Sequence, residues 1–142
     1  MGRYRILVAD PNPAVRKLLS VIFDPGRYEL IFASDGEEAL GRCLVDPPML
    51  VIAELWLDRL DGVALCERLK GLPKTAGAKV VLLTTSTGEW DVRRARRAGV
   101  DEYFTKPFSP AQLLKQVDRL LNRAARPRTE LSPRSLDGGS NR

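Results

Sequence analysis

Residues Gly99 to Phe108 read GVDEYFTKPF, and they combine a short strand with a lysine at its carboxyl end. Asp101 to Thr105 is β-rich, and it follows a glycine that ends a helical pattern. Lys106-Pro107-Phe108 comes next, and a peptide bond before a proline can be cis, which would fix the direction from which the lysine approaches its neighbours. The stretch predicts the last strand of a sheet whose carboxyl edge carries an ammonium group.

The same alternation of strand and helix runs through the chain before this stretch. Apolar runs of strand length are separated by segments in which apolar residues recur at helical spacing. The expected strands are Arg5–Ala9, Tyr28–Ala33, Met49–Ala53, Lys79–Leu83 and Asp101–Thr105. The expected helices are Pro13–Phe23, one that opens at Ser34 and runs to about Val45, one from Asp61 to Gly71, one from Ser86 to Gly99, and one from Ser109. The pattern predicts an α/β protein with a doubly wound, five-stranded parallel sheet covered by helices on both faces.

Three of the helices begin with a recognisable capping pattern. Ser34 with Glu37, and Ser86 with Glu89, have the spacing of a capping box. Ser109 precedes a proline at the first helical position, with Gln112 three residues after the cap. The buried stripe expected for this last helix is Leu113, Leu114, Val117, Leu120 and Leu121.

Length and composition indicate one domain. The chain has 142 residues, 44% of them hydrophobic, which suffices for a single core over residues 1–125. Residues 126–142 lack apolar periodicity and carry +2 of the +5 net charge, so we expect a disordered basic tail. No apolar stretch approaches the length of a membrane span, and the first residues enter a strand pattern directly, so we expect a soluble, cytoplasmic protein.

The absence of histidine excludes a histidine-based catalytic triad and the usual zinc sites. Cys43 and Cys66 have no metal-ligand spacing, and we interpret both as small hydrophobic core residues.

Polar residues stand at the carboxyl end of four predicted strands. They are Asp10, Glu54, Thr84 and Lys106. Because the carboxyl ends of parallel strands share one edge, and the functional crevice of such sheets lies there, we expect these side chains to form one site.

Four segments carry a resemblance to a known family. ILVADPNPAVRKLL, VIAELWLDRLDG, LLTT and GVDEYFTKPF resemble the motifs of the receiver domain of bacterial two-component response regulators, and the likeness covers Tyr4 to Arg123. The resemblance implies a flavodoxin-like (βα)5 fold with strand order 2-1-3-4-5. It also implies phosphoryl transfer from a histidine kinase to an aspartate with the help of magnesium.

The site departs from the family pattern at three positions. Glu54 stands where the family has its phosphoacceptor aspartate, Pro11 replaces the second acidic residue, and Asp58 replaces a proline. Asp10, Thr84 and Lys106 match the family's first acid, hydroxyl and lysine, and Tyr103 matches the aromatic residue that switches with the site.

The departures at Glu54 and Pro11 act against phosphoryl transfer. Pro11 offers no side-chain oxygen, so magnesium binding should be weak or absent, and we expect no metal or other cofactor. Glu54 adds one methylene, on the order of 1.3–1.5 Å, and a misplacement of about 1 Å can cost roughly a hundredfold in a positioned reaction. The longer side chain should instead reach Lys106 and Thr84.

We therefore expect a phosphorylation-independent signalling module that is not an enzyme and holds one conformation, with Tyr103 turned inward. One alternative is a receiver still phosphorylated at Glu54 or Asp58. Another, of a different class, is a small flavodoxin-like ligand-binding protein or hydrolase. Asp61 precedes a glycine at a helix start and is interpreted as a cap.

The fourth helix carries a candidate docking surface. Its residues are Trp90, Arg93, Arg94, Arg96 and Arg97. Arginines beside an aromatic residue are typical of protein interfaces, so an acidic protein partner is expected. The resemblance places such partners, a histidine kinase or an output protein, on the face of the fourth helix, fifth strand and fifth helix, and family members often dimerise through these helices. No DNA-reading element is recognisable, so we expect no direct contact with nucleic acid, and none with a membrane.

Overall fold

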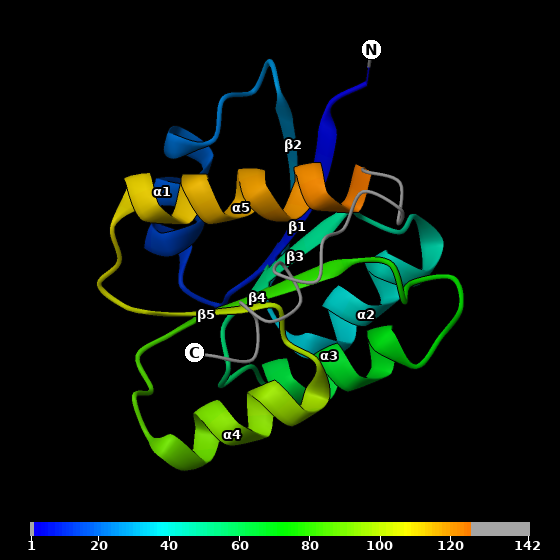
Figure 1. Ribbon diagram of the computed structural model, residues 1–142, viewed down its shortest axis with the longest axis vertical. Coiled ribbons are helices and arrows are strands. Elements are labelled where there is room, and N and C mark those ends of the chain that lie inside the picture. Colours follow the sequence, from blue (N-terminus) through cyan, green and yellow to red (C-terminus); the bar gives the residue numbers. More distant parts are fainter. Residues whose placement is uncertain (1, 126–142) are drawn as a thin grey trace.

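The computed structural model describes residues 2–125, which form a single αβ unit (Figure 1). The strands are β1 (Tyr4–Ala9), β2 (Tyr28–Ala33), β3 (Leu50–Ala53), β4 (Lys79–Thr84) and β5 (Glu102–Thr105). The helices are α1 (Pro13–Ile22), α2 (Gly36–Val45), α3 (Gly62–Lys70), α4 (Glu89–Ala98) and α5 (Pro110–Ala125). Residues 126–142 lie outside the described part, so the expected disorder of the tail stays a prediction.

The strands form one sheet in the order β2-β1-β3-β4-β5, and all four neighbouring pairs are parallel. The fold class and strand order expected from the sequence are therefore confirmed. Every residue of β3 is buried, and so are the last five of β4, as expected for strands covered on both faces. The order places β1 and β3 side by side, so the residues that follow them meet at one edge.

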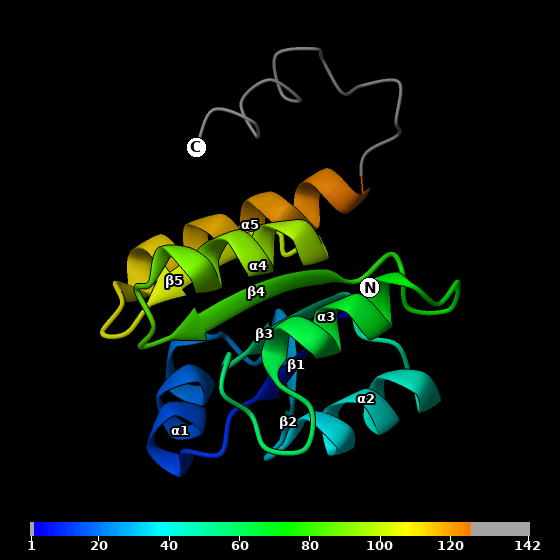
Figure 2. The same ribbon diagram turned by 90° about the horizontal axis from the view of Figure 1, so that it is seen from below.

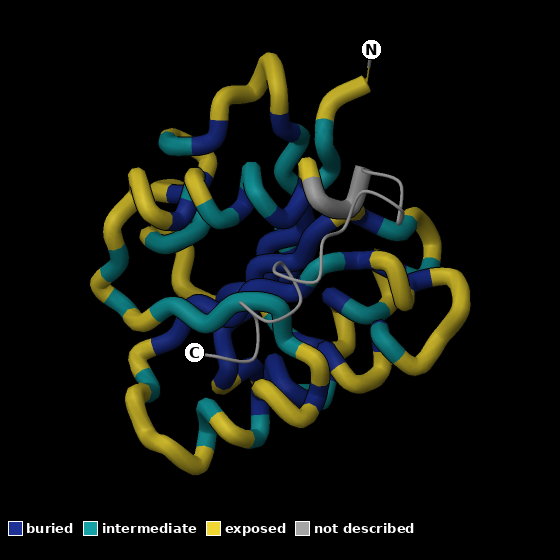
Figure 3. Tube along the Cα trace, in the orientation of Figure 1, coloured by how far each residue is buried: buried dark blue, intermediate teal, exposed yellow. Residues whose placement is uncertain are grey.

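Helices cover both faces of the sheet (Figure 1). α1 and α5 pack on one face over a core that includes Leu19, Phe23 and Leu113, whereas α2, α3 and α4 pack on the other. α4 and α5 lie on opposite sides of the β5 end of the sheet in Figure 1, and they overlap only in the turned view of Figure 2. Figure 3 shows the buried backbone concentrated in the central strands and the exposed backbone on the outer turns of the helices. The stripe predicted for α5 is confirmed, although Leu114 is only partly buried.

The start of α2 is one residue later than the predicted capping box. Asp35, not Ser34, is the N-cap, and its carboxylate accepts from the amide of Glu38. Glu38, not Glu37, reaches back to the amide of Ser34 at 2.8 Å. A tertiary contact decides between the neighbouring candidates: the Gly36 amide donates to Asp58 O, and a Cβ at Gly36 would lie 1.7 Å from Leu60 O.

The second predicted capping box is wrong. α4 is preceded by Gly88, which makes no side-chain cap, and Ser86 lies two residues before it. The Ser86 hydroxyl donates instead to the Asp91 carboxylate inside the helix. The cap predicted for α5 is confirmed, because the Gln112 amide donates to Ser109 Oγ at 3.2 Å.

α3 begins directly against Glu54 and Leu55, the two residues that follow β3. Asp61 caps the helix by accepting from the Ala64 amide at 2.8 Å. The Gly62 amide donates to Leu55 O at 2.7 Å, and a Cβ at Gly62 would lie 2.6 Å from Glu54 O. The close approach needs glycine and ties the first turn of α3 to the backbone of Glu54.

Cys43 and Cys66 are buried free thiols, which confirms their interpretation as core residues. Burial raises the pKa of Cys43 to about 12 and that of Cys66 to about 11. Both side chains therefore stay neutral and apolar at physiological pH.

Candidate functional site

The four strand-end residues predicted from the sequence meet at one point on the carboxyl edge of the sheet. Lys106 Nζ donates to Asp10 Oδ2 and to Glu54 Oε1, both at 2.8 Å. Asp10, Glu54 and Thr84 are buried, and the peptide bond between Lys106 and Pro107 is cis. One ammonium group thus bridges two buried carboxylates.

The remaining carboxylate oxygens bind local backbone amides. Glu54 Oε2 accepts from the Trp56 amide at 3.2 Å, and Asp10 Oδ1 accepts from the Asn12 amide at 2.9 Å. Arg16 donates to the backbone oxygen of Asp10 at 2.6 Å and braces the loop after β1. Each oxygen of the two carboxylates therefore has a donor within the chain.

The bridge shifts the titration of both partners away from neutral pH. Burial raises the pKa of Glu54, but hydrogen bonds from Lys106, Thr84 and the Trp56 amide outweigh it, so the pKa lies below its usual value. Burial lowers the pKa of Lys106, but the contacts with Asp10 and Glu54 outweigh it, so the pKa lies above its usual value. Glu54 and Lys106 are consequently both charged at pH 7.

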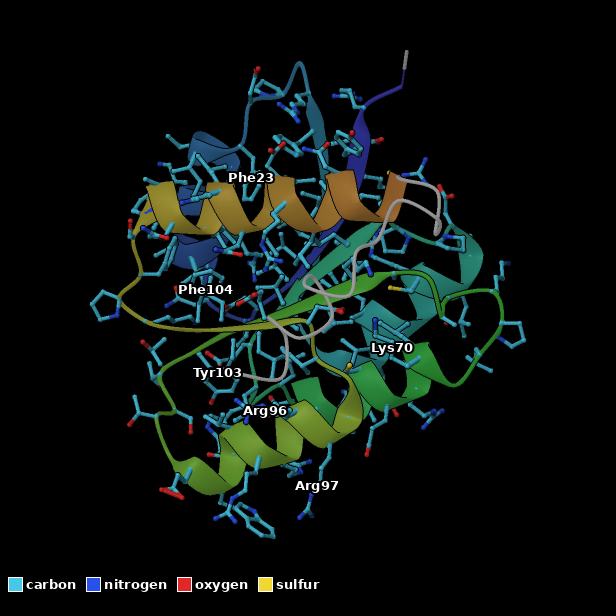
Figure 4. All side chains as sticks on the ribbon, viewed as in Figure 1. Phe23, Lys70, Arg96, Arg97, Tyr103 and Phe104 are labelled. Atoms are coloured by element: carbon cyan, nitrogen blue, oxygen red, sulfur yellow. The ribbon has the colours of Figure 1, made fainter. Side chains whose placement is uncertain are left out.

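Thr84 and Tyr103 are joined through Ser86, whose sequence spacing predicted a helix cap. Thr84 Oγ1 accepts from the Ser86 amide at 3.3 Å, and the Tyr103 hydroxyl donates to Ser86 O at 2.9 Å. The Tyr103 ring packs partly buried against the core under α4, while Phe104 points to the opposite face of the sheet (Figure 4). The Tyr103 ring is therefore partly buried, and its role as a switch stays a prediction.

The donor set at this edge does not fit magnesium. Mg²⁺ requires near-octahedral oxygen ligands at short distance. Here the two carboxylates share an ammonium group, and Pro11, exposed beside them, brings no side-chain oxygen. Within residues 2–125 no three acidic, cysteine or histidine side chains gather as a metal site.

Comparison with known proteins places the chain in a family. Residues 6–118 match the response regulator receiver domain. The chain belongs to this family.

None of the helices in the described part is long and apolar enough to cross a membrane.

The relatives agree with this assignment. The receiver is 32% identical over 136 residues to the alkaline phosphatase synthesis transcriptional regulatory protein PhoP of Bacillus subtilis, covering 94% of this chain and 56% of that protein. The crystal structure of the signal receiver domain of a signal transduction histidine kinase from Syntrophus aciditrophicus is 30% identical, with a TM-score of 0.81 over 92% of this chain and 98% of that one. A two-component response regulator from Clostridium difficile, 23% identical with a TM-score of 0.80, shares the fold and covers 87% and 100% of the two chains. The receiver spans about half the length of the curated relatives that it matches.

Two further acidic residues of the receiver lie near Glu54 in sequence. Asp61 caps α3 with one oxygen and accepts from Arg94 Nη2 with the other at 2.8 Å, so the interpretation as a cap agrees with the structure. Asp58 is exposed in the loop, and its backbone oxygen accepts from the amides of Gly36 and Leu60.

Four residues of the predicted docking surface line one hollow on α4, and Arg96 lies apart from them; the four are Trp90, Arg93, Arg94 and Arg97. Trp90, Arg93 and Arg97 are exposed along the outer side of the helix, with Trp90 69% exposed. Arg94 turns inward to Asp61, and Arg96 lines a separate groove with Tyr103 between α4 and β5 (Figure 4). The role of these residues in docking stays a prediction. We call the three exposed ones, Trp90, Arg93 and Arg97, the α4 ridge. A spacing of 3.6 residues per turn places positions 90, 93, 94 and 97 on one side of the helix and position 96 on another. The contact with Asp61 then shields the Arg94 side chain more than those of its neighbours on that side.

Proposed function

We propose that this receiver signals without a phosphorylation cycle and that Glu54 acts as a permanent anion at the phosphoacceptor position. The observation that carries the proposal is the bridge from Lys106 Nζ to Glu54 Oε1 at 2.8 Å. The bridge gives Lys106 a fixed anionic partner that requires neither phosphate nor metal. Asp10, which would otherwise be a metal ligand, accepts a hydrogen bond from the same ammonium group.

The length of the Glu54 side chain supports this role. An incoming phosphoryl group needs a free carboxylate oxygen, a cation to offset its charge and an aligned approach. Both oxygens of Glu54 already accept hydrogen bonds, and the neighbouring cation is held by two carboxylates. A phosphate would bring about −1.5 to −2 of charge, whereas Glu54 brings −1. Glu54 therefore supplies a smaller negative charge than a phosphate would, but supplies it permanently.

The contacts beyond the bridge support a single conformation that resembles the occupied state of a receiver. Thr84 helps to hold the pKa of Glu54 low, and the Ser86 backbone joins Thr84 to Tyr103. A conformational change follows a ligand only where the ligand distinguishes two states. Because Glu54 is always present, the inward position of Tyr103 needs no signal.

The receiver would act through protein contacts and not as an enzyme. The α4 ridge, together with β5 and α5, offers arginine and tryptophan side chains to an acidic surface of a kinase, an output protein or a second copy of the chain. Several relatives are named as transcriptional regulators, and the receiver covers only part of each. Any contact with nucleic acid would therefore belong to a segment other than the described fold.

Incubation with acetyl phosphate and magnesium, read by intact mass, tests the proposal. The matched variant is Pro11→Asp/Glu54→Asp, which restores both acids of the family pattern. We expect the natural chain to remain unmodified and the variant to gain one phosphoryl group. Stoichiometric modification of the natural chain would contradict the proposal, and fragment masses would then distinguish Glu54 from Asp58.

A further inference from the structure

Two polar side-chain contacts attach α4 to the segments around the site at the carboxyl edge of the sheet. Asp91 Oδ2 in its first turn accepts from Ser86 Oγ in the loop after β4. Arg94, one turn later, donates to Asp61 Oδ2 at 2.8 Å. The two contacts lead to different strands, because the first belongs to the β4 side of the pocket and the second to the β3 side.

The β4-side contact connects directly to the residues of the site. Ser86 uses three separate groups: its amide donates to Thr84, its backbone oxygen accepts from Tyr103, and its hydroxyl donates to Asp91. Ser86 therefore joins a pocket residue, the aromatic residue of β5 and the first turn of α4. Replacement by alanine would remove only the contact with α4.

The β3-side contact connects to Glu54 through rigid backbone. Asp61 stands at the start of α3, where the Gly62 amide donates to Leu55 O and where no space is left for a side chain at Gly62. The Asp61 and Arg94 side chains are largely shielded from solvent, at 24% and 35% exposure, so the ion pair is screened less than the Glu89–Arg93 pair on the outside of the same helix. The hydrogen bond that Arg94 donates to Asp61 also raises the pKa of Arg94, which keeps that side chain charged.

We propose that Ser86 and Arg94 are positioning residues that fix the rotation of α4 and thereby aim the α4 ridge at its partner. Ala95 and Ala98 pack α4 against the core, but their side chains are small. Two polar attachments one turn apart, to two separate strands, restrict the rotation that this packing leaves open. Coupling of this kind is carried by contiguous contacts between two sites. Arg94 thus contributes to docking through its contact with Asp61, which positions α4. The proposal deepens the proposed function, but its test needs neither a partner nor phosphate.

Amide hydrogen exchange of the full chain tests the proposal, with α5 as an internal reference. Arg94→Gln and Asp61→Asn each remove the ion pair, and asparagine retains an acceptor for the α3 cap. We expect either change to speed exchange in residues 92–98 by about two- to fivefold, which corresponds to a modest, partly shielded ion pair. Ser86→Ala should speed exchange at the amino end of the same helix, and α5 should remain unchanged.

The matched control is Arg93→Gln, the same substitution at the adjacent, outward position. The double variant Asp61→Asn/Arg94→Gln should exchange no faster than the faster single variant, because one contact cannot be lost twice. The effects of Asp61→Asn and Arg93→Gln should multiply, since Arg93 is not part of that contact. Multiplying effects in the first pair, or equal exchange in Arg94→Gln and the natural chain, would overturn the proposal. Retention of normal α4 exchange by Arg94→Lys would further support it, because lysine keeps the charge toward Asp61.

Discussion

Replacing Lys106 by methionine measures how much the ammonium group of the bridge contributes to the stability of the fold. The side chains of Lys106, Asp10 and Glu54 are 16%, 4% and 10% exposed, so water cannot take over the role of the ammonium group without rearrangement. Removing one partner from a buried ionic cluster typically costs about 3–5 kcal/mol, because an uncompensated charge remains. We expect Lys106→Met to lower the free energy of unfolding by that amount.

Urea denaturation at pH 7, followed by circular dichroism, measures the change. With a slope of about 2 kcal/mol per molar urea, the midpoint should fall by about 2 M. Lys115→Met is the matched control, because Lys115 is exposed on α5, and surface substitutions usually change stability by less than about 0.5 kcal/mol. The loss in Lys106→Met should shrink in acid, where protonation neutralises the abandoned carboxylates. A Lys106→Met midpoint equal to that of Lys115→Met would refute the reasoning.

Three further predictions follow from the same contacts. Folding lowers the pKa of Glu54, so the contribution of Glu54 to stability is complete above the unfolded value of 4.5 and is lost as pH falls through the folded pKa. Urea midpoints measured across this pH range should therefore decline, and they should decline more steeply in the natural chain than in Glu54→Gln. Glu54→Gln itself keeps the size of the side chain but loses the charge facing Lys106, so it should cost about 1.5–3 kcal/mol at pH 7 by urea denaturation, and an unchanged midpoint would count against the bridge. Cys43 and Cys66 should react with iodoacetamide only after unfolding, because burial raises the pKa of each thiol; rapid labelling of the native chain would contradict this.

The sequence predicts the convergence of the site because that convergence follows from topology. Parallel strands present their carboxyl ends at one edge, so a polar residue after each of β1, β3 and β5 must approach the others. The contact of Lys106 with Glu54 follows from this arrangement and from the length of the two side chains. The additional hydrogen bond from Lys106 to Asp10 at 2.8 Å follows from the adjacency of β1 and β3.

Local choices between adjacent residues are less accessible to sequence reasoning. Ser34 and Asp35 can both cap a helix, and the contact of Gly36 with the distant Asp58 backbone decides between them. Ser86 has the spacing of a cap, but its bonds to Thr84, to Asp91 and to the distant Tyr103 outweigh that local preference. Arg94 likewise faces inward only because α3 presents Asp61 opposite it. Each of these outcomes depends on a partner distant in sequence or on the packing of another element.

The amide spectrum of the protein before and after addition of beryllofluoride and magnesium tests the central claim most directly. Beryllofluoride is a phosphoryl mimic that would bind at Glu54 if the site still accepted one. If Glu54 is a permanent anion held by Lys106, the nuclear magnetic resonance signals of Ser86, Tyr103 and α4 should not move. A new set of signals for these residues, appearing at stoichiometric beryllofluoride and only with magnesium, would contradict the account.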